Sequence, residues 1–426
     1  MLTKLKNSLS LNNFYDAARI MGFLFAFGIP WSTACMNIGF YLMVIFFLFG
    51  SIGNFNCKSA FKTPASILGI LLFSFIALKS FSSIADWQLA KGDIAHYRKL
   101  LAIPLLIALF HNTALKKNLV YSYLLGVCFL ITPTIIDGFG MSAITSKISL
   151  FPRIPGYNVG DFTYWKNHII HGFHVAILFS AALLHSIFYK RLRKTSILIS
   201  LLAITDLLFF IKARAALICL IVIICYFMIT VSKNNKKIIL LSAIFAVLIS
   251  SIYFTSPSVQ QRVKSSVNEL SSFNSKNDIS TSGGTRLHYW QISWDMFLKA
   301  PLTGMGGGSF KQTLIMTNDP LLPQAHGHCH NEYISLLSQY GIVGISLFIY
   351  LLFIAFKDAS KSNDIWISGI SKMGLIIFAI NALTDASLNN YSEGWTFIIL
   401  VAIATKNINL KNPKKLIAPS MTSKPA

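Results

Sequence analysis

The chain has 426 residues, of which 54% are hydrophobic and only 12% are charged, whereas an average soluble domain has about 25% charged residues. This composition excludes an ordinary soluble globular protein and indicates a membrane protein. The formal net charge of +22 would suit nucleic acid, but the basic residues lie mostly between apolar runs and not beside stackable aromatics on a soluble face, so no nucleic-acid partner is predicted.

Apolar runs of about the 20 residues needed to cross a ~30 Å hydrocarbon layer recur along most of the chain. We therefore expect an all-α polytopic membrane protein with about 12 transmembrane helices and one long outer loop. No small-residue cleavage site follows the first run, so we expect it to remain as an uncleaved span. The predicted spans cover residues 20–34, 36–53, 63–81, 97–111, 118–137, 167–189, 195–211, 214–231, 237–255, 338–356, 365–384 and 392–405.

Lys and Arg in the short loops set the orientation of such a chain. They gather on the side that holds the N-terminus, so we expect both termini in the cytoplasm and the longest loop outside the cytoplasmic membrane. The chain then divides into a transmembrane bundle of about nine helices (1–255), an outer loop with an amphipathic helix (256–330), C-terminal transmembrane helices (331–405) and a basic cytoplasmic tail (406–426).

The long outer loop contains one helical pattern and one glycine-rich turn. Apolar residues recur at helical spacing after Arg286 and predict an amphipathic helix that rests on the membrane or the bundle and ends at Pro301. These apolar residues are Leu287, Trp290, Trp294, Phe297 and Leu298. The glycines at 304 and 306–308 predict a flexible turn, with an anion-binding nest as the alternative.

A second outer loop, 138–166, is rich in Gly, Pro and aromatic residues and includes Arg153 and Trp165. Aromatic faces and hydroxyls suit a sugar or a lipid headgroup. An interfacial aromatic belt explains the same composition, so this loop is a secondary candidate for substrate binding.

His330 stands immediately before an apolar helix that would begin at Asn331. The positive end of the helix dipole disfavours a charged imidazolium, so the ring should be able to accept a proton, and the same helix end attracts anions. A straight helix over 331–356 would be about 39 Å long and would lift its first turns clear of the lipid. Gly341 and Gly344 would let this helix pack closely on its neighbours.

Two arginines face the same outer compartment. Arg214 lies at the outer end of the predicted span 214–231, and Arg286 lies just before the amphipathic helix. Forked guanidinium donors match phosphate oxygens, so the pair predicts a diphosphate ligand, with a snorkelling interfacial arginine as the alternative for Arg214. Asp385 and Glu393, near the last outer loop, are candidates to orient a base or to pair with an arginine.

Histidines and cysteine at His326, His328, Cys329 and His330 also invite a zinc interpretation. These ligands crowd into five residues with no second pair at metal-site spacing, and the outer loops contain no Asp-x-Asp pair. We therefore predict no metal and no cofactor. A further stripe, His168, His171 and His174, lies on a predicted span and is interpreted as structural or interfacial.

At these residues the sequence resembles the O-antigen ligase and polymerase superfamily of bacterial envelope glycosyltransferases. The signature of that superfamily is His-[Asn/Ser/Gln]-x9-Gly-x-x-Gly after a long periplasmic loop. His330-Asn331, nine residues, Gly341 and Gly344 match it in full. The length and the single late loop look most like the lipopolysaccharide O-antigen ligases.

The resemblance extends to Arg214 and to the segment that leads through Arg286. It implies a GT-C-like membrane glycosyltransferase of the inner membrane that transfers glycan from undecaprenyl diphosphate to a sugar of lipid A-core, with inversion and without metal or nucleotide. By matching position, Arg214 and Arg286 would bind the diphosphate and stabilise it as leaving group, and His330 would be the base.

Substrate contacts are expected from residues near these three and from the second outer loop, namely Asn331, His328, Arg153, Trp165 and Trp290. An O-antigen polymerase and a protein O-oligosaccharyltransferase share the signature and differ in acceptor, so both stay open. A lipid-linked glycan transporter is the alternative from another class. Membrane lipids are expected partners, and the sequence leaves the oligomeric state unknown.

Overall fold

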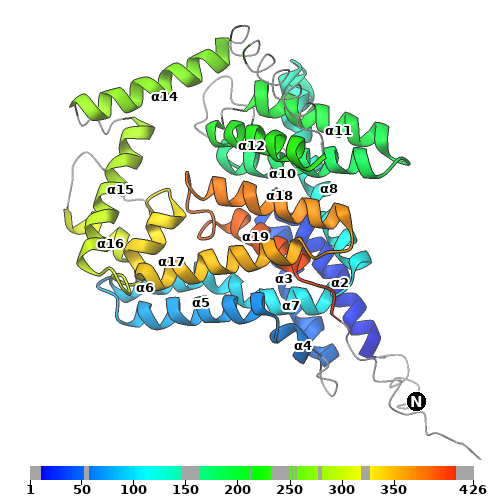
Figure 1. The fold of residues 1–426 in the computed structure, drawn as a ribbon, viewed down its shortest axis with the longest axis horizontal. Helices are drawn as coiled ribbons and strands as arrows, with labels where there is room; N and C mark the ends of the chain where they lie inside the picture. The colour runs from blue at the N-terminus through cyan, green and yellow to red at the C-terminus, as the bar shows by residue number, and fades with distance from the viewer. Residues whose placement is uncertain are drawn as a thin grey trace, which may run out of the picture.

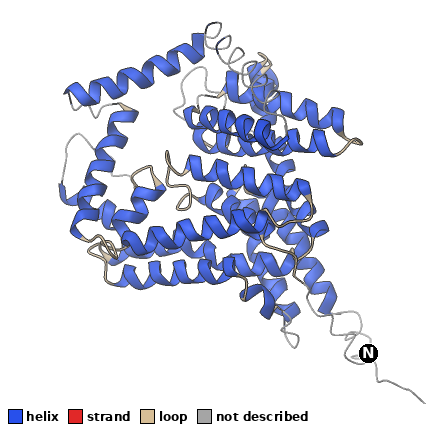
Figure 2. Ribbon diagram, in the orientation of Figure 1, coloured by secondary structure: helices blue, strands red, loops and turns tan. Residues whose placement is uncertain are grey.

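The computed structural model describes residues 11–51, 57–145, 163–211, 213–231, 250, 254, 257–276, 281–317 and 327–408. Within these ranges the chain folds into helices joined by turns and loops, and no strand is drawn for them (Figure 2). The all-α prediction is confirmed for the part of the chain that the structure describes.

Helices lie over most of the predicted apolar runs (Figure 1), but residues 97–111 form a 3₁₀ turn and a seven-residue helix, and the run 20–34 is divided between two helices. The 3₁₀ turn η1 covers Arg98–Ala102 and the π-helical turn η2 covers Asp206–Phe210. The α-helices are α2 Leu11–Gly28, α3 Thr33–Ser51, α4 Lys58–Phe61, α5 Pro64–Phe81, α6 Trp87–Tyr97, α7 Ile103–Leu109, α8 Thr113–Gly138, α9 Ser142–Thr145, α10 His168–Phe188, α11 Arg193–Thr205, α12 Arg214–Val231, α14 Pro257–Lys276, α15 Ser282–Lys299, α16 Ser309–Thr317, α17 Glu332–Ala359, α18 Ile365–Asn381 and α19 Tyr391–Ala404.

Five of the described helices, α3, α5, α8, α10 and α17, are long and apolar enough to cross a membrane, and α12, α18 and α19 contain shorter apolar stretches. The chain is thus consistent with a polytopic membrane protein. The count of twelve spans stays a prediction. The expected span 237–255 lies outside the described residues, apart from positions 250 and 254.

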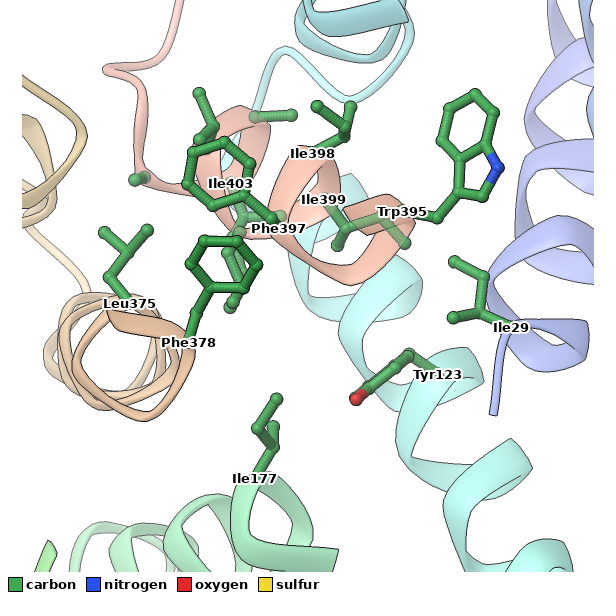
Figure 3. Close-up of a cluster of buried hydrophobic side chains, with 14 of the residues drawn as sticks. Ile29, Tyr123, Ile177, Leu375, Phe378, Trp395, Phe397, Ile398, Ile399 and Ile403 are labelled. Carbon is green, nitrogen blue, oxygen red and sulfur yellow. The ribbon is translucent and has the colours of Figure 1, made fainter. Parts of the chain in front are cut away.

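Helix α19 lies at the centre of the bundle, and every residue from Ser392 to Ala404 is buried. Its Phe397 ring stacks on Phe378 of α18 with ring centroids 4.5 Å apart (Figure 3). Its Trp395 ring meets Phe25 of α2 edge-on, with centroids 5.2 Å apart. A helix that is apolar on all sides belongs in the interior of a bundle. The loop that enters α19 is therefore anchored to the most buried helix.

Helix α17 is broken at Gly341, whose φ of 64° and ψ of −165° are not helical. The break frees backbone groups that bond to the segment after α15: Ile342 N donates to Pro301 O (2.9 Å) and Val343 N to Leu302 O (3.2 Å). A Cβ atom on Gly341 would lie 2.4 Å from the Leu302 carbonyl carbon. Only glycine accommodates both the positive φ and this approach.

The same break accepts hydrogen bonds from the following turn, where Met305 N donates to Ser338 O (3.1 Å) and Gly306 N to Gln339 O (2.8 Å). The expectation of a straight helix is therefore wrong. Gly341 serves to dock the outer loop rather than to bring two helices together. Gly344 is needed for a related reason, because a Cβ there would lie 2.4 Å from the Cβ of Tyr340 across the break.

The glycine-rich turn binds a carboxyl group of the protein itself. Gly304, Gly306 and Gly308 have positive φ, and Gly308 N donates to Oδ2 of the buried Asp93 at 3.2 Å. Burial raises the pKa of Asp93, and the hydrogen bonds from Tyr340 and Gly308 oppose that shift without cancelling it. The nest alternative for a substrate anion is thus not supported, because this turn packs on α6 and α17.

The amphipathic helix α15 begins before Arg286, at Ser282, where the Thr281 hydroxyl oxygen accepts a hydrogen bond from Gly284 N (3.0 Å). The expected start after Arg286 is therefore too late, because the threonine cap draws both glycines into the first turn. Its buried face, Tyr289 and Met296, packs with residues of α16 and with Cys329. Helices α14, α15 and α16 gather at one end of the bundle (Figure 1).

Candidate active site

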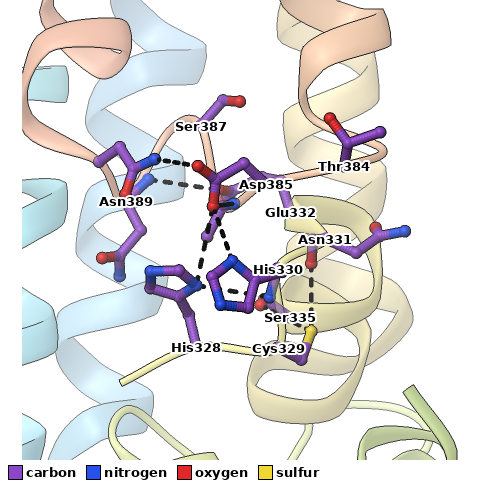
Figure 4. Close-up of polar contacts among 12 residues, drawn as sticks. His328, Cys329, His330, Asn331, Glu332, Ser335, Thr384, Asp385, Ser387 and Asn389 are labelled. Atoms are coloured by element: carbon purple, nitrogen blue, oxygen red, sulfur yellow. Dashed lines mark hydrogen bonds and ion pairs between the residues drawn. The ribbon is translucent and has the colours of Figure 1, made fainter. Parts of the chain in front are cut away.

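The candidate site is built around His330 and Asp385, which are 55 residues apart in sequence. His330 Nδ1 lies 3.2 Å from Asp385 Oδ1, and His328 Nδ1 lies 3.9 Å from the same oxygen. Both imidazoles point toward this carboxylate, which lies in the loop between α18 and α19 (Figure 4). A carboxylate only accepts hydrogen bonds, so Nδ1 of His330 carries the proton and Nε2 is the nitrogen that can act as base.

The backbone around His330 is held in an uncommon conformation. His330 has a φ of 55°, a left-handed value that non-glycine residues adopt only where the surroundings impose it. On one side the Trp290 indole donates to Cys329 O (3.1 Å). On the other side Asn331 caps α17: its Oδ1 accepts from Ile334 N (3.1 Å), and its Nδ2 donates to Leu383 O (3.0 Å).

Asp385 is itself fixed by hydrogen bonds. Asn390 Nδ2 donates to Oδ2 (2.9 Å) and Ala386 N donates to Oδ1 (2.9 Å). Burial alone would raise the pKa of Asp385, but the hydrogen bond from His330 and the charges of His328 and His330 lower it. The lowered pKa favours the ionised carboxylate, which can accept a hydrogen bond from an imidazole.

The loop that carries Asp385 is organised by the buried side chain of Glu332, the first residue of α17. Its Oε2 accepts from Leu388 N (2.9 Å) and Asn389 N (3.2 Å), and its Oε1 accepts from the Tyr97 hydroxyl (2.9 Å). Glu332 thus ties the helix that follows His330 to the loop that holds Asp385.

Lys99 and Asn389 complete this support. Lys99 Nζ donates to the carbonyls of Leu388 (2.9 Å), Asn389 (3.3 Å) and Asn390 (2.6 Å). Asn389 Nδ2 donates to Asp93 Oδ1 (3.0 Å). We call Asp93, Lys99, Glu332 and Asn389 the loop frame. No sequence pattern predicts it, because its members are far apart along the chain.

Glu393 is the other carboxylate that the sequence makes a candidate to orient the base or to pair with an arginine. In the structure it is fully buried, and its Oε1 accepts from Asn381 Nδ2 at 2.7 Å. Glu393 thus lies in the first turn of α19 and bonds to Asn381. Asp385 is the carboxylate that contacts His330.

Arg286 lies in the first half of α15 and is partly buried. Among the described residues its guanidinium makes no hydrogen bond or ion pair. Burial lowers its pKa, while the charges of Asp385 and Glu269 act in the opposite direction. The guanidinium is thus close enough to Asp385 to interact with it electrostatically.

Arg214 is paired instead. Its two terminal nitrogens bond to both carboxylate oxygens of Glu269 in α14, at 3.0 and 2.7 Å. Glu269 Oε2 also accepts from Gly283 N in the first turn of α15 (3.0 Å). The hydrogen bond from Arg214 lowers the pKa of Glu269 against the effect of burial. The sequence pattern predicted a role for this arginine but gave no indication of the glutamate.

Comparison with known proteins points to one family. The family model described as O-Antigen ligase matches residues 198–349. The O-antigen ligase of Escherichia coli (strain K12) is 30% identical over 142 residues, which are 31% of this chain. Over this part of its length the chain is similar to the O-antigen ligase superfamily. The match covers 34% of the length of that O-antigen ligase, about a third.

The superfamily match contains Arg214, Arg286 and His330 but ends before Asp385. Of the other candidate residues, His328 and Trp290 lie beside His330, whereas Trp165 packs on Trp31 and Phe129. Arg153 and His326 lie outside the described residues. The amide of Asn331 is engaged with the protein at both ends, which favours a positioning role over substrate contact.

Two members of the histidine stripe, His171 and His174, lie inside the bundle. His171 is fully buried 3.0 Å from Asp206. His174 lies between the Tyr123 hydroxyl (2.7 Å) and the Ser392 hydroxyl (2.8 Å). These contacts link α10 to α8, η2 and α19, as the structural interpretation of the stripe predicted.

The residues that could bind a zinc ion in the structure differ from the set that the sequence suggested. Cys329 turns away from the histidines and contacts Asn331 O (3.3 Å) and Ser335 Oγ (3.1 Å) (Figure 4). His328, His330 and Asp385 place one ligand atom each within 4.8 Å of one another. A cation there would compete with the His330–Asp385 hydrogen bond for the same atoms, so a chelator experiment separates the two arrangements.

Proposed function

We propose that this protein is an O-antigen ligase. It transfers O-polysaccharide from undecaprenyl diphosphate to a sugar of lipid A-core in lipopolysaccharide biosynthesis. The observation that carries the proposal is the His330–Asp385 pair, 3.2 Å apart. The guanidinium of Arg286, which has no hydrogen-bond partner among the described residues, acts on the same carboxylate. A base and an anion-binding group in one place suit transfer from a lipid diphosphate.

In the proposed reaction Nε2 of His330 takes the proton of the acceptor hydroxyl. The acceptor oxygen bonds to the anomeric carbon of the glycan as the bond from that carbon to the diphosphate breaks, with inversion. Arg286 and Arg214 stabilise the charge on the departing undecaprenyl diphosphate. A positioned base contributes typically 10²–10⁴-fold, and preorganised charge at the leaving group often contributes more. No step needs a metal or a nucleotide.

Asp385 orients His330 and stabilises the imidazolium that forms, as the acid of a catalytic triad does. The loop frame keeps Asp385 in place before the substrate arrives. His328 and Trp290 are proposed to contact the sugar beside His330, and Arg153 and Trp165 in the second outer loop to contact the glycan or its lipid headgroup.

The proposed location is the bacterial inner membrane, with both termini in the cytoplasm and the site facing the periplasm. The division into an N-terminal bundle (1–255), a periplasmic loop (256–330), C-terminal helices (331–405) and a cytoplasmic tail (406–426) goes with this topology. It places α14, α15 and His330 where a lipid-linked glycan on the outer leaflet can reach them.

The test is transfer of undecaprenyl-diphosphate-linked glycan onto lipid A-core by the purified protein, with chelator present. Wild type should form product. His330→Ala and Arg286→Ala should lose it while retaining their thermal unfolding profile, and Asp16→Asn, which removes an exposed ion pair with Arg19, should not. Loss of wild-type activity in chelator would favour the cation arrangement. Growth of the carrier-linked glycan with no acceptor modified would identify a polymerase instead.

A further inference from the structure

The carboxylate of Glu269 lies where, in the proposed function, the phosphate oxygens of the donor would bind. Its carboxylate binds both terminal nitrogens of Arg214 and the backbone N–H of Gly283 in the first turn of α15. Arg286, three residues further along α15, also acts on it electrostatically. Two guanidinium groups and a helix N-terminus are the donors that a diphosphate would use.

The fit of the carboxylate is close. A Cβ atom on Gly283 would lie 2.7 Å from Glu269 Oε2 and 3.3 Å from its Cβ, so the glycine makes room for this contact. Glu269 is also the only acidic residue in the sequence between Asp206 and Asp278. The carboxylate is thus a single negative charge placed among groups that bind anions.

The contact is also one that can be exchanged. The Arg214 side chain is 45% exposed and that of Glu269 15% exposed, so water and a competing anion can reach the guanidinium. Accessible ion pairs contribute little to stability, whereas a diphosphate offers more charge and more acceptor oxygens. An incoming diphosphate can therefore displace the carboxylate.

We propose that Glu269 is an internal counter-anion that holds Arg214 and the start of α15 in the donor site and is exchanged for the diphosphate when the donor binds. It thereby determines the affinity for the donor and releases α14 from Arg214 on binding. This inference rests on the proposed function, since it takes the lipid diphosphate as the ligand of Arg214.

The test measures binding of farnesyl diphosphate, a soluble prenyl diphosphate, to the purified full chain. Glu269→Gln keeps the size of the side chain and removes the competing charge, so the Kd should fall by about two- to fivefold. Asp16→Asn removes a carboxylate from another exposed arginine pair and should leave the Kd unchanged. In an Arg214→Ala background Glu269→Gln should give no such gain, because the competition takes place at Arg214.

Hydrogen exchange in the wild type provides a second readout that does not depend on a folded variant. Backbone amides of α14 should exchange faster once farnesyl diphosphate is bound, because the Arg214–Glu269 contact is lost. Slower or unchanged exchange would mean that the pair persists and would overturn the proposal.

The outcomes separate the two proposals. Wild type that binds farnesyl diphosphate and transfers glycan, together with a Glu269→Gln Kd that is unchanged or higher, rejects the role of Glu269 and leaves the ligase intact. Wild type that neither binds the probe nor transfers glycan rejects both. A lower Kd in Glu269→Gln with faster exchange in α14 supports the exchange.

Discussion

The His330–Asp385 pair and the Arg214–Glu269 pair both act on Arg286, and the protein holds them in different ways. The Asp385 side chain is 6% exposed and receives hydrogen bonds from Asn390 and Ala386 as well as from His330. The Arg214 side chain is 45% exposed and depends on contacts with one helix, α14. In the proposed function, the base is thus held in place before the substrate arrives, while the ion pair at the diphosphate site can be exchanged.

This difference matches the demands of the two tasks. A base must hold one orientation within tight limits, so its supports are buried and satisfied. A leaving-group site must admit a large charged ligand and later release it, so a weak, accessible ion pair suits it better.

Replacing Asp385 by Asn should lower the rate of glycan transfer by about 10²–10⁴-fold. The amide neither fixes the tautomer of His330 nor stabilises its charged form. Initial rates at saturating donor measure the effect, and the Kd for farnesyl diphosphate should change little. A rate within about threefold of wild type would show that His330 works without this partner.

Replacing Gly341 by Ala should lower the free energy of unfolding by about 2–4 kcal/mol, since a positive φ and a collision with the Leu302 carbonyl both oppose a side chain. Thermal unfolding in detergent measures the loss. Gly92→Ala is the matched control: a Cβ there meets nothing within 4 Å in helix α6, so stability should stay or rise slightly. Equal unfolding temperatures for the two variants would contradict the docking role of the break.

Replacing Glu332 by Gln should cost about 1–3 kcal/mol of stability. The new amide group would face the N–H groups of Leu388 and Asn389 or the Tyr97 hydroxyl, all of which donate to Glu332. Thermal unfolding and transfer rate should fall together, because the loop that holds Asp385 loosens. A full loss of activity at unchanged stability would instead assign Glu332 a direct chemical role.

Acidification should give the smallest effect, through Glu269. The hydrogen bond from Arg214 lowers the folded pKa of Glu269, so its stabilisation is present above the ordinary pKa of the carboxyl and is lost as pH falls through the lowered one. The free energy of unfolding of the wild type should exceed that of Glu269→Gln by at most about 1 kcal/mol at neutral pH. The free energies of unfolding of the two proteins should become equal in acid. A difference that stays constant at all pH values would exclude the charged pair as its source.

Several features of the molecule could be predicted from sequence because they are local. Apolar runs of about 20 residues report membrane helices wherever they occur, and α3, α5, α8, α10 and α17 are long and apolar enough to be such spans. The spacing from His330 to Gly341 and Gly344 pointed to the superfamily. Charge and periodicity also located Arg214, Arg286 and the amphipathic helix before the fold was known.

Tertiary structure decided which of these residues meet. Asp385 and Glu269 became partners of His330 and Arg214 only because the fold brings together positions 55 residues apart in each case. The role of Gly341 changed for the same reason, since its φ is dictated by the docking of residues 301–306 and not by its own helix. Helix propensity and hydropathy act over a few residues, whereas hydrogen-bond partners are chosen by packing across the whole chain.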